Sequence, residues 1–156
     1  MGLDMYLSGK RYMSHHFNEG DGQRQEAIAE LFPELKDRKG RWGDASPVKE
    51  VKIEAGYWRK ANAIHKWFVD NVQGGVDDCG NYYVSRDQLQ ELKKLCEKVL
   101  AFRHLAVECL PAQSGFFFGG TDYDEWYFAD LENTVKIIDD CLALPPSWEF
   151  EYQSSW

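Results

Sequence analysis

The chain has 156 residues, the size of one ordinary domain, and 44% of them are hydrophobic, which is enough for a hydrophobic core. Its formal net charge of -8 argues against general DNA or RNA binding, which needs many Lys and Arg side chains to neutralise phosphates. The sequence has no apolar run long enough to cross a bilayer and does not begin with a signal-peptide pattern. We therefore expect a cytoplasmic protein with no membrane partner.

In the first half of the chain, two segments alternate apolar and polar residues and predict strands, at residues 2–12 and 48–55. The weaker pattern between them predicts an irregular insert at residues 14–47, with one short helix at residues 23–32. An amphipathic helix is predicted at residues 57–71.

In the second half, residues 82–84 predict a short strand, and Ser85 with Gln88 forms the pattern of a capping box at the start of a helix. Residues 105–110 predict an apolar turn or helix, and residues 116–118 a short buried strand. A long helix is predicted at residues 122–144, with Asp122 as its N-cap and Glu125 completing a second capping box.

Residues 148–153 alternate aromatic and polar side chains and predict a last strand, covered by a helix or used as a subunit contact. The order of these elements predicts an α+β fold, with an antiparallel or mixed sheet and about three main helices packed mostly on one face. We expect one domain over residues 1–156. The aromatic content of 15% favours a homo-oligomer with rings in its interface.

The predicted helix at residues 57–71 carries more rings and charges than a core-packing helix needs. Rings suit stacking on a base, cations suit phosphates, and amide or imidazole groups suit base edges and ribose. The candidate ligand-binding residues of this segment are Tyr57, Trp58, Arg59, Lys60, Asn62, His65 and Lys66.

A second aromatic block surrounds the glycine pair Gly119-Gly120. The acids that follow the pair disfavour a phosphate there, so a tight turn that lets a base or ribose approach is the better interpretation. The candidate stacking residues of this block are Phe116, Phe117, Phe118, Tyr123, Trp126 and Tyr127.

Motifs for catalysis or metal binding are missing from the sequence. The four cysteines form no C-x-x-C pair and predict buried free thiols, and Asp122, Asp124 and Glu125 match no calcium loop. His65 has no partner that the sequence identifies as its orienting group or nucleophile. We expect no metal and no cofactor, and the sequence favours binding over catalysis.

Three blocks carry a resemblance to a known family: MGLDMYL at residues 1–7, YWRKANAIHKWFVDN at residues 57–71 and SGFFFGGTDYDEWY at residues 114–127. The chain resembles a family of bacteriophage and prophage proteins, over most of its length except the insert. Some members are labelled phosphoglycerate kinase, but this chain lacks the two-domain length and the substrate motifs of that reaction. The resemblance implies a phage accessory protein that acts in the bacterial host cytoplasm, and it supplies no site residues.

The leading hypothesis is a phage sponge, a non-catalytic protein that sequesters a host nucleotide immune signal such as a cyclic dinucleotide. One alternative is an enzyme that degrades such a nucleotide with His65, Asp122 and Asp124 in its site. The other is a protein–protein module that inhibits a host factor through residues 148–156.

Overall fold

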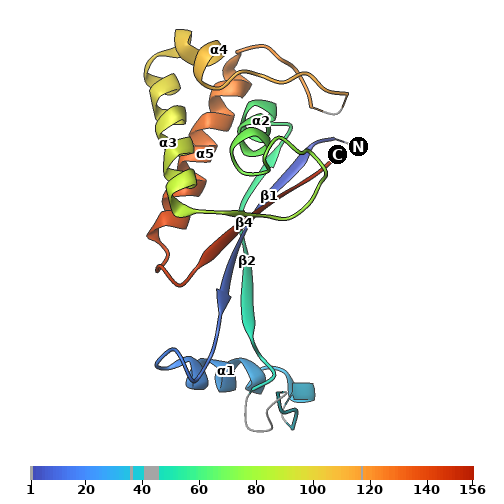
Figure 1. Ribbon diagram of the computed structural model, residues 1–156, viewed down its shortest axis with the longest axis vertical. Coiled ribbons are helices and arrows are strands. Elements are labelled where there is room, and N and C mark those ends of the chain that lie inside the picture. The colour runs from blue at the N-terminus through green and yellow to red at the C-terminus, as the bar shows by residue number, and fades with distance from the viewer. Residues whose placement is uncertain (1, 36, 41–45, 117) are drawn as a thin grey trace. The chain divides into compact units, whose positions relative to one another are not determined.

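The computed structural model describes residues 2–35, 37–40, 46–116 and 118–156. Within them the fold is α+β, with five α-helices and a four-stranded antiparallel sheet of order β2-β1-β4-β3 (Figure 1). The strands are β1 (Asp4–Tyr12), β2 (Glu50–Arg59), β3 (Tyr82–Val84) and β4 (Glu149–Ser155). The predicted fold class is confirmed.

The number of helices differs from the prediction of about three. The α-helices in the described ranges are α1 (Asp21–Glu30), α2 (Asn62–Asn71), α3 (Arg86–Ala101), α4 (Ala106–Cys109) and α5 (Glu125–Ala143), with 3-10 turns at Pro33–Leu35 and Arg103–Leu105. The two helices beyond the three main ones are α1, which lies where the short helix at residues 23–32 was predicted, and α4, a single turn where the apolar turn or helix at residues 105–110 was predicted. None of these helices is both long and apolar enough to span a membrane.

The chain divides into two compact units, the first formed by Met1–Gly9 with Ile53–Trp156 and the second by Lys10–Lys52. In the second unit, the buried Asp21 accepts hydrogen bonds from Arg11 Nη2 at 2.8 Å and from the Ser14 amide at 3.0 Å. Burial acts to raise the pKa of Asp21, but the Ser14 hydrogen bond and the nearby arginines outweigh it and lower the pKa.

The core of the first unit lies between strands β1 and β4 and helices α2, α3 and α5. Buried residues alternate along β1, as a half-buried strand requires, and Phe68 of α2 stacks on Tyr152 of β4 with ring centroids 3.9 Å apart. Helices α3 and α5 lie side by side (Figure 1). Their buried residues include Leu89, Leu92, Cys96, Val99, Leu131 and Ile138.

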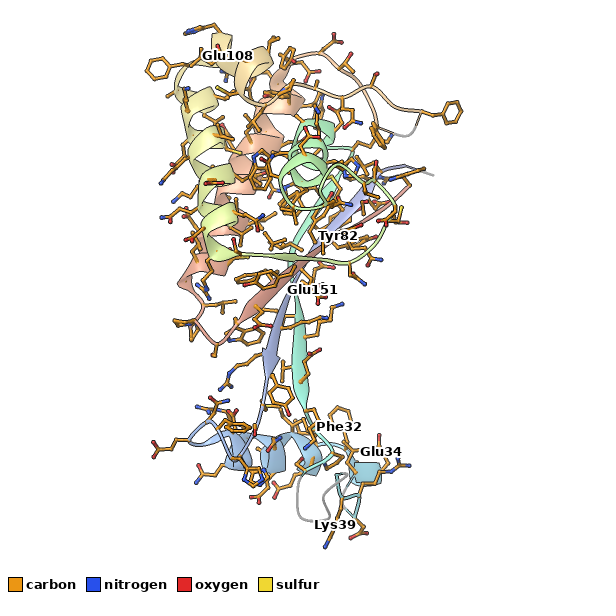
Figure 2. All side chains as sticks on the ribbon, viewed as in Figure 1. Phe32, Glu34, Lys39, Tyr82, Glu108 and Glu151 are labelled. Atoms are coloured by element: carbon orange, nitrogen blue, oxygen red, sulfur yellow. The ribbon has the colours of Figure 1, made fainter. Side chains whose placement is uncertain are left out.

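Several local predictions are confirmed. Strand β3 has the predicted bounds, and its residue Tyr83 pairs with Glu151 of β4; Figure 2 labels Glu151 and the adjacent Tyr82. The predicted capping box at Ser85 and Gln88 begins α3, with both reciprocal hydrogen bonds present.

The predicted helix at residues 57–71 begins too early. Residues Tyr57 to Arg59 continue strand β2, with Trp58 buried and its neighbours exposed, and α2 starts only at Asn62. Aromatic residues favour strands, and the period-two pattern of β2 continues through them.

Two predictions in the second half are also wrong. The N-cap of α5 is Asp124 and not Asp122, because an Asp124 oxygen accepts from the amides of Trp126 and Tyr127. Phe116 and Phe118 belong to no strand, and Phe117 lies outside the described residues.

The four cysteines are free thiols with two kinds of surroundings. Cys96 and Cys141 are buried, and burial raises the pKa of Cys96 to about 12 and that of Cys141 to about 11. Cys79 and Cys109 are partly exposed, so the predicted burial holds for only two of the four.

Candidate functional site: a cleft at the start of helix α2

A cleft of about 310 Å³ opens in the first unit where β2 passes into α2. Its opposite wall comes from the segment before α5 and the first turns of that helix. The cleft is lined by residues 59–64, by Gly119, Gly120, Asp122 and Asp124, and by Trp126, Tyr127, Asp130 and Leu131.

The N-terminus of α2 opens into this cleft without a side-chain cap. Ala61 is the N-cap residue and makes no side-chain hydrogen bond, while the His65 amide is the first to donate back, to the Ala61 carbonyl. First-turn amides such as those of Ala63 and Ile64 have no acceptor within a helix. Together with the helix dipole, they favour an anion at this end of the cleft.

Lys60 stands between the strand and the helix in an unusual backbone conformation, with φ of 60°. The Lys60 amide donates to the Leu3 carbonyl at 2.7 Å, and the Lys60 carbonyl accepts from the Asn62 amide at 2.8 Å. A left-handed residue other than glycine is strained, and such residues gather at functional sites.

Gly119 approaches the Lys60 side chain closely. With φ of 82°, Gly119 has a backbone conformation that favours glycine, and a Cβ added there would lie 3.3 Å from Lys60 Cβ. The glycine turn and the lysine stem therefore pack against each other at the edge of the cleft.

Asn62 connects the loop before α5 to the start of α2 through side-chain hydrogen bonds. Its Nδ2 donates to the carbonyls of Phe118 at 3.0 Å and Gly120 at 2.7 Å, and its Oδ1 accepts from the Gln113 amide at 3.0 Å. The buried Asn62 amide thus uses both ends to shape the cleft wall and is not available to a ligand.

Helix α5 contributes two rings and one carboxylate to the cleft, from Trp126, Tyr127 and Asp130. The Trp126 side chain is 81% exposed, whereas the hydroxyl of the buried Tyr127 donates to the Leu110 carbonyl at 2.8 Å. Asp130 is half-buried, and burial, helped by the nearby Asp124 charge, raises its pKa to about 6.

Five of the sequence-predicted site residues line this cleft: Arg59, Lys60, Asn62, Trp126 and Tyr127. Arg59 is 64% exposed at its side chain and lies 3.9 Å from Asp4, a loose ion pair that leaves the guanidinium able to turn toward a ligand.

Trp58 and His65 belong to the core instead. Trp58 is only 2% exposed, and its Nε1 donates to Thr134 Oγ1 at 2.9 Å. His65 is fully buried, with Nδ1 2.8 Å from the Tyr152 hydroxyl and Nε2 3.0 Å from Asp77. Neither ring faces the cleft.

The remaining predicted residues also lie elsewhere. Tyr57 donates its hydroxyl to Asp4, and Lys66 pairs with Asp70 along α2 at 2.6 Å. The Tyr123 hydroxyl accepts from the Ala112 amide at 3.1 Å.

The two described phenylalanines of the predicted stacking block have opposite surroundings. Phe116 is almost fully exposed and does not line the cleft. Phe118 is buried, edge-on to His65 with ring centroids 5.1 Å apart. If Phe116 or Phe118 stacks on a base, it must do so on a surface other than this cleft.

Sequence reasoning missed Asp130 and the free amides at the start of α2. Asp130 follows Trp126 by four residues, so helical spacing from an aromatic residue could have indicated it. The amides could not be found because the helix was predicted to start five residues earlier. Among the described residues, no group of His, Cys, Asp or Glu side chains is placed to hold a metal ion.

Comparisons with known proteins add no assignment to this cleft. The chain matches no protein-family model, no curated protein and no solved structure.

Proposed function

We propose that the protein is a non-catalytic binder that sequesters a nucleotide signal, with one nucleotide unit held in the cleft at the start of α2. The observation that supports this most is that one cleft combines uncapped helix amides, two cations and an exposed indole. Phosphate suits the amides of α2 with Arg59 and Lys60, and a base suits the face of Trp126. The volume of about 310 Å³ is near the lower end for small-molecule sites, about 300–1,000 Å³, which suits one nucleotide unit.

Binding is favoured over turnover by the state of the polar groups around the cleft. The Tyr127 hydroxyl is engaged with a backbone carbonyl, and Asp124 caps α5. His65 is turned into the core. The acid of the cleft that stays uncommitted, Asp130, has no orienting partner among the described residues, so the cleft is better suited to hold a ligand than to transfer protons.

The resemblance to bacteriophage and prophage proteins supports a role in the host cytoplasm, where an immune signal can be removed by tight binding alone. A nanomolar dissociation constant, about -12 kcal/mol, would be enough when the protein is in excess over its ligand.

Titration calorimetry with nucleoside monophosphates and cyclic dinucleotides tests the proposal. We expect Trp126→Ala to weaken binding about tenfold or more, since stacking on an aromatic ring contributes about 1–3 kcal/mol per base. Arg59→Gln should weaken binding by a similar factor through the lost phosphate contact.

The matched controls replace predicted residues that lie outside the cleft. Lys66→Gln removes a cation, and Phe116→Ala removes an exposed ring. Both should bind like the wild type. Chromatography of the ligand after heat denaturation of the complex should return it intact. Failure of every nucleotide to bind the pure protein would defeat the proposal, and recovery of a cleaved ligand would show an enzyme.

A further inference from the structure

Trp126 and Asp130 share one face of α5 inside the cleft. Residues four apart on a helix are neighbours, with Cβ atoms about 5–6 Å apart. A planar base stacked on the Trp126 indole can therefore present one edge to the Asp130 carboxyl group.

The Asp130 side chain has no hydrogen-bond or ion-pair partner among the described residues. Thr134 Oγ1 donates to the backbone carbonyl of Asp130 and not to its carboxyl group. The charged groups that line the cleft around it are Arg59 and Lys60 on one wall and Asp122 and Asp124 on the other. Asp122 and Asp124 are exposed, and Asp124 uses one oxygen to cap α5, so Asp130 is the half-buried acceptor that remains for a ligand.

A carboxylate is an acceptor with two oxygens, and it pairs best with two adjacent N–H donors. Among the common bases, guanine offers this arrangement, with N1–H beside its 2-amino group. Adenine and cytosine place a ring-nitrogen acceptor beside their amino group, and uracil flanks its N3–H with two carbonyls. Each of these three would bring an acceptor close to a carboxylate oxygen.

We propose that Asp130 makes the cleft selective for guanine nucleotides by accepting hydrogen bonds from guanine N1–H and the 2-amino group. This inference rests on the proposed nucleotide-binding function and names the base.

The raised pKa of Asp130, about 6, gives this preference a pH dependence. At pH 7.5 the group is a carboxylate and matches both donors of guanine. At pH 5.0 it is protonated, one of its oxygens carries a hydrogen, and the match to guanine is lost. Selectivity for guanine should therefore rise as the pH rises through about 6.

The test measures the affinities of GMP and IMP by titration calorimetry at pH 7.5 and 5.0. The two nucleotides differ only by the 2-amino group. Wild-type protein should bind GMP about tenfold more tightly than IMP at pH 7.5, as expected for a hydrogen bond to a charged group. This ratio should fall to about two or less at pH 5.0. Because IMP carries the same phosphate, the ratio is insensitive to titration of the phosphate.

In Asp130→Asn, the GMP-to-IMP ratio should be about two or less at both pH values. Glu132→Gln, which removes an exposed acid of the same helix outside the cleft, should keep the wild-type ratio. The wild-type ratio and its pH dependence test the inference even if the Asp130→Asn variant does not fold.

Three outcomes would overturn the guanine assignment while nucleotide binding stands. The first is equal affinity of the wild-type protein for GMP and IMP at pH 7.5. The others are tighter binding of AMP than of GMP and a GMP-to-IMP selectivity that persists in Asp130→Asn. Absence of binding by all three nucleotides would instead overturn the proposed function.

Discussion

Trp58 and Trp126 have opposite surroundings, so their substitution should have opposite effects. Trp58→Phe removes a buried hydrogen bond to Thr134 and leaves a small cavity, which should lower the free energy of unfolding by about 1–3 kcal/mol. Nucleotide affinity should change by no more than about twofold, because Trp58 does not line the cleft. Urea unfolding and calorimetry measure the two effects.

Trp126→Phe is the matched variant to Trp58→Phe, because it makes the same substitution at an exposed tryptophan that lines the cleft. It should change the free energy of unfolding by no more than about 0.5 kcal/mol, as a surface substitution does, while affinity decreases with the smaller ring. A loss of affinity in Trp58→Phe with none in Trp126→Phe would contradict the placement of the ligand.

Asp130 should destabilise the ligand-free protein above about pH 6. Burial raises its pKa in the folded state to about 6, from the ordinary value of 3.8 for an aspartate. Between these values the unfolded chain releases the proton and the folded protein keeps it, so stability falls as the pH rises through this window. Below about pH 4 both states hold the proton and the effect vanishes.

Asp130→Asn should therefore raise the free energy of unfolding at pH 7.5 by on the order of 1–2 kcal/mol, allowing for partial solvent screening. The difference from wild type should shrink toward zero near pH 4. Denaturant unfolding at the two pH values measures it, and a destabilised variant at pH 7.5 would refute the assigned burial effect.

At the scale of an element, the start of α3 depends on a reciprocal pair of hydrogen bonds. The Gln88 amide donates to Ser85 Oγ at 3.1 Å, and the Ser85 amide donates to Gln88 Oε1 at 2.9 Å. Gln88 Nε2 also donates to the Asn71 carbonyl at the end of α2, at 2.8 Å. Gln88 therefore connects two helices, which Ser85 does not.

Ser85→Ala should lower the free energy of unfolding by about 1 kcal/mol, as loss of an N-cap does, and Gln88→Ala by at least as much. The exposed Gln90→Ala on the same helix is the control and should be nearly neutral. Thermal and urea unfolding provide the measurement. If Ser85→Ala lowered the free energy of unfolding more than Gln88→Ala, the hydrogen bond from Gln88 to the Asn71 carbonyl would not contribute as expected.

These elements show where local sequence signals are sufficient. The capping box at Ser85 and strand β3 depend on neighbouring residues, and both were predicted with correct bounds. At the boundary between β2 and α2, the period-two pattern continues through Trp58, but the helical pattern of the following residues overlaps it. The left-handed Lys60 ends the strand, and local patterns do not encode that conformation. Because that boundary shapes the cleft, the sequence indicated Arg59 and Lys60 but not the amides beside them.

At the scale of the whole molecule, the division of contacts predicts two blocks of protection from hydrogen exchange. Asp21 accepts from two arginines and a backbone amide within Lys10–Lys52. Its lowered pKa means that the carboxylate stabilises this unit above its unfolded pKa, and that the stabilisation is lost as the pH falls through the folded value.

Asp21→Asn should therefore accelerate amide exchange in residues 10–52 at neutral pH, with a much smaller change in α3 and α5. Exchange followed by mass spectrometry resolves the two blocks. Equal acceleration throughout the chain would mean that the molecule opens as one cooperative unit.

The two kinds of cysteine make the protein convenient to label. A thiol reagent such as a maleimide attacks the thiolate, so at neutral pH it should attach at Cys79 and Cys109 while Cys96 and Cys141 stay unmodified until the fold opens. Neither reactive position lines the cleft, and a dye there would report on a ligand without occupying its place. Counting the modified thiols over time would then read out the rate of global opening in the same sample.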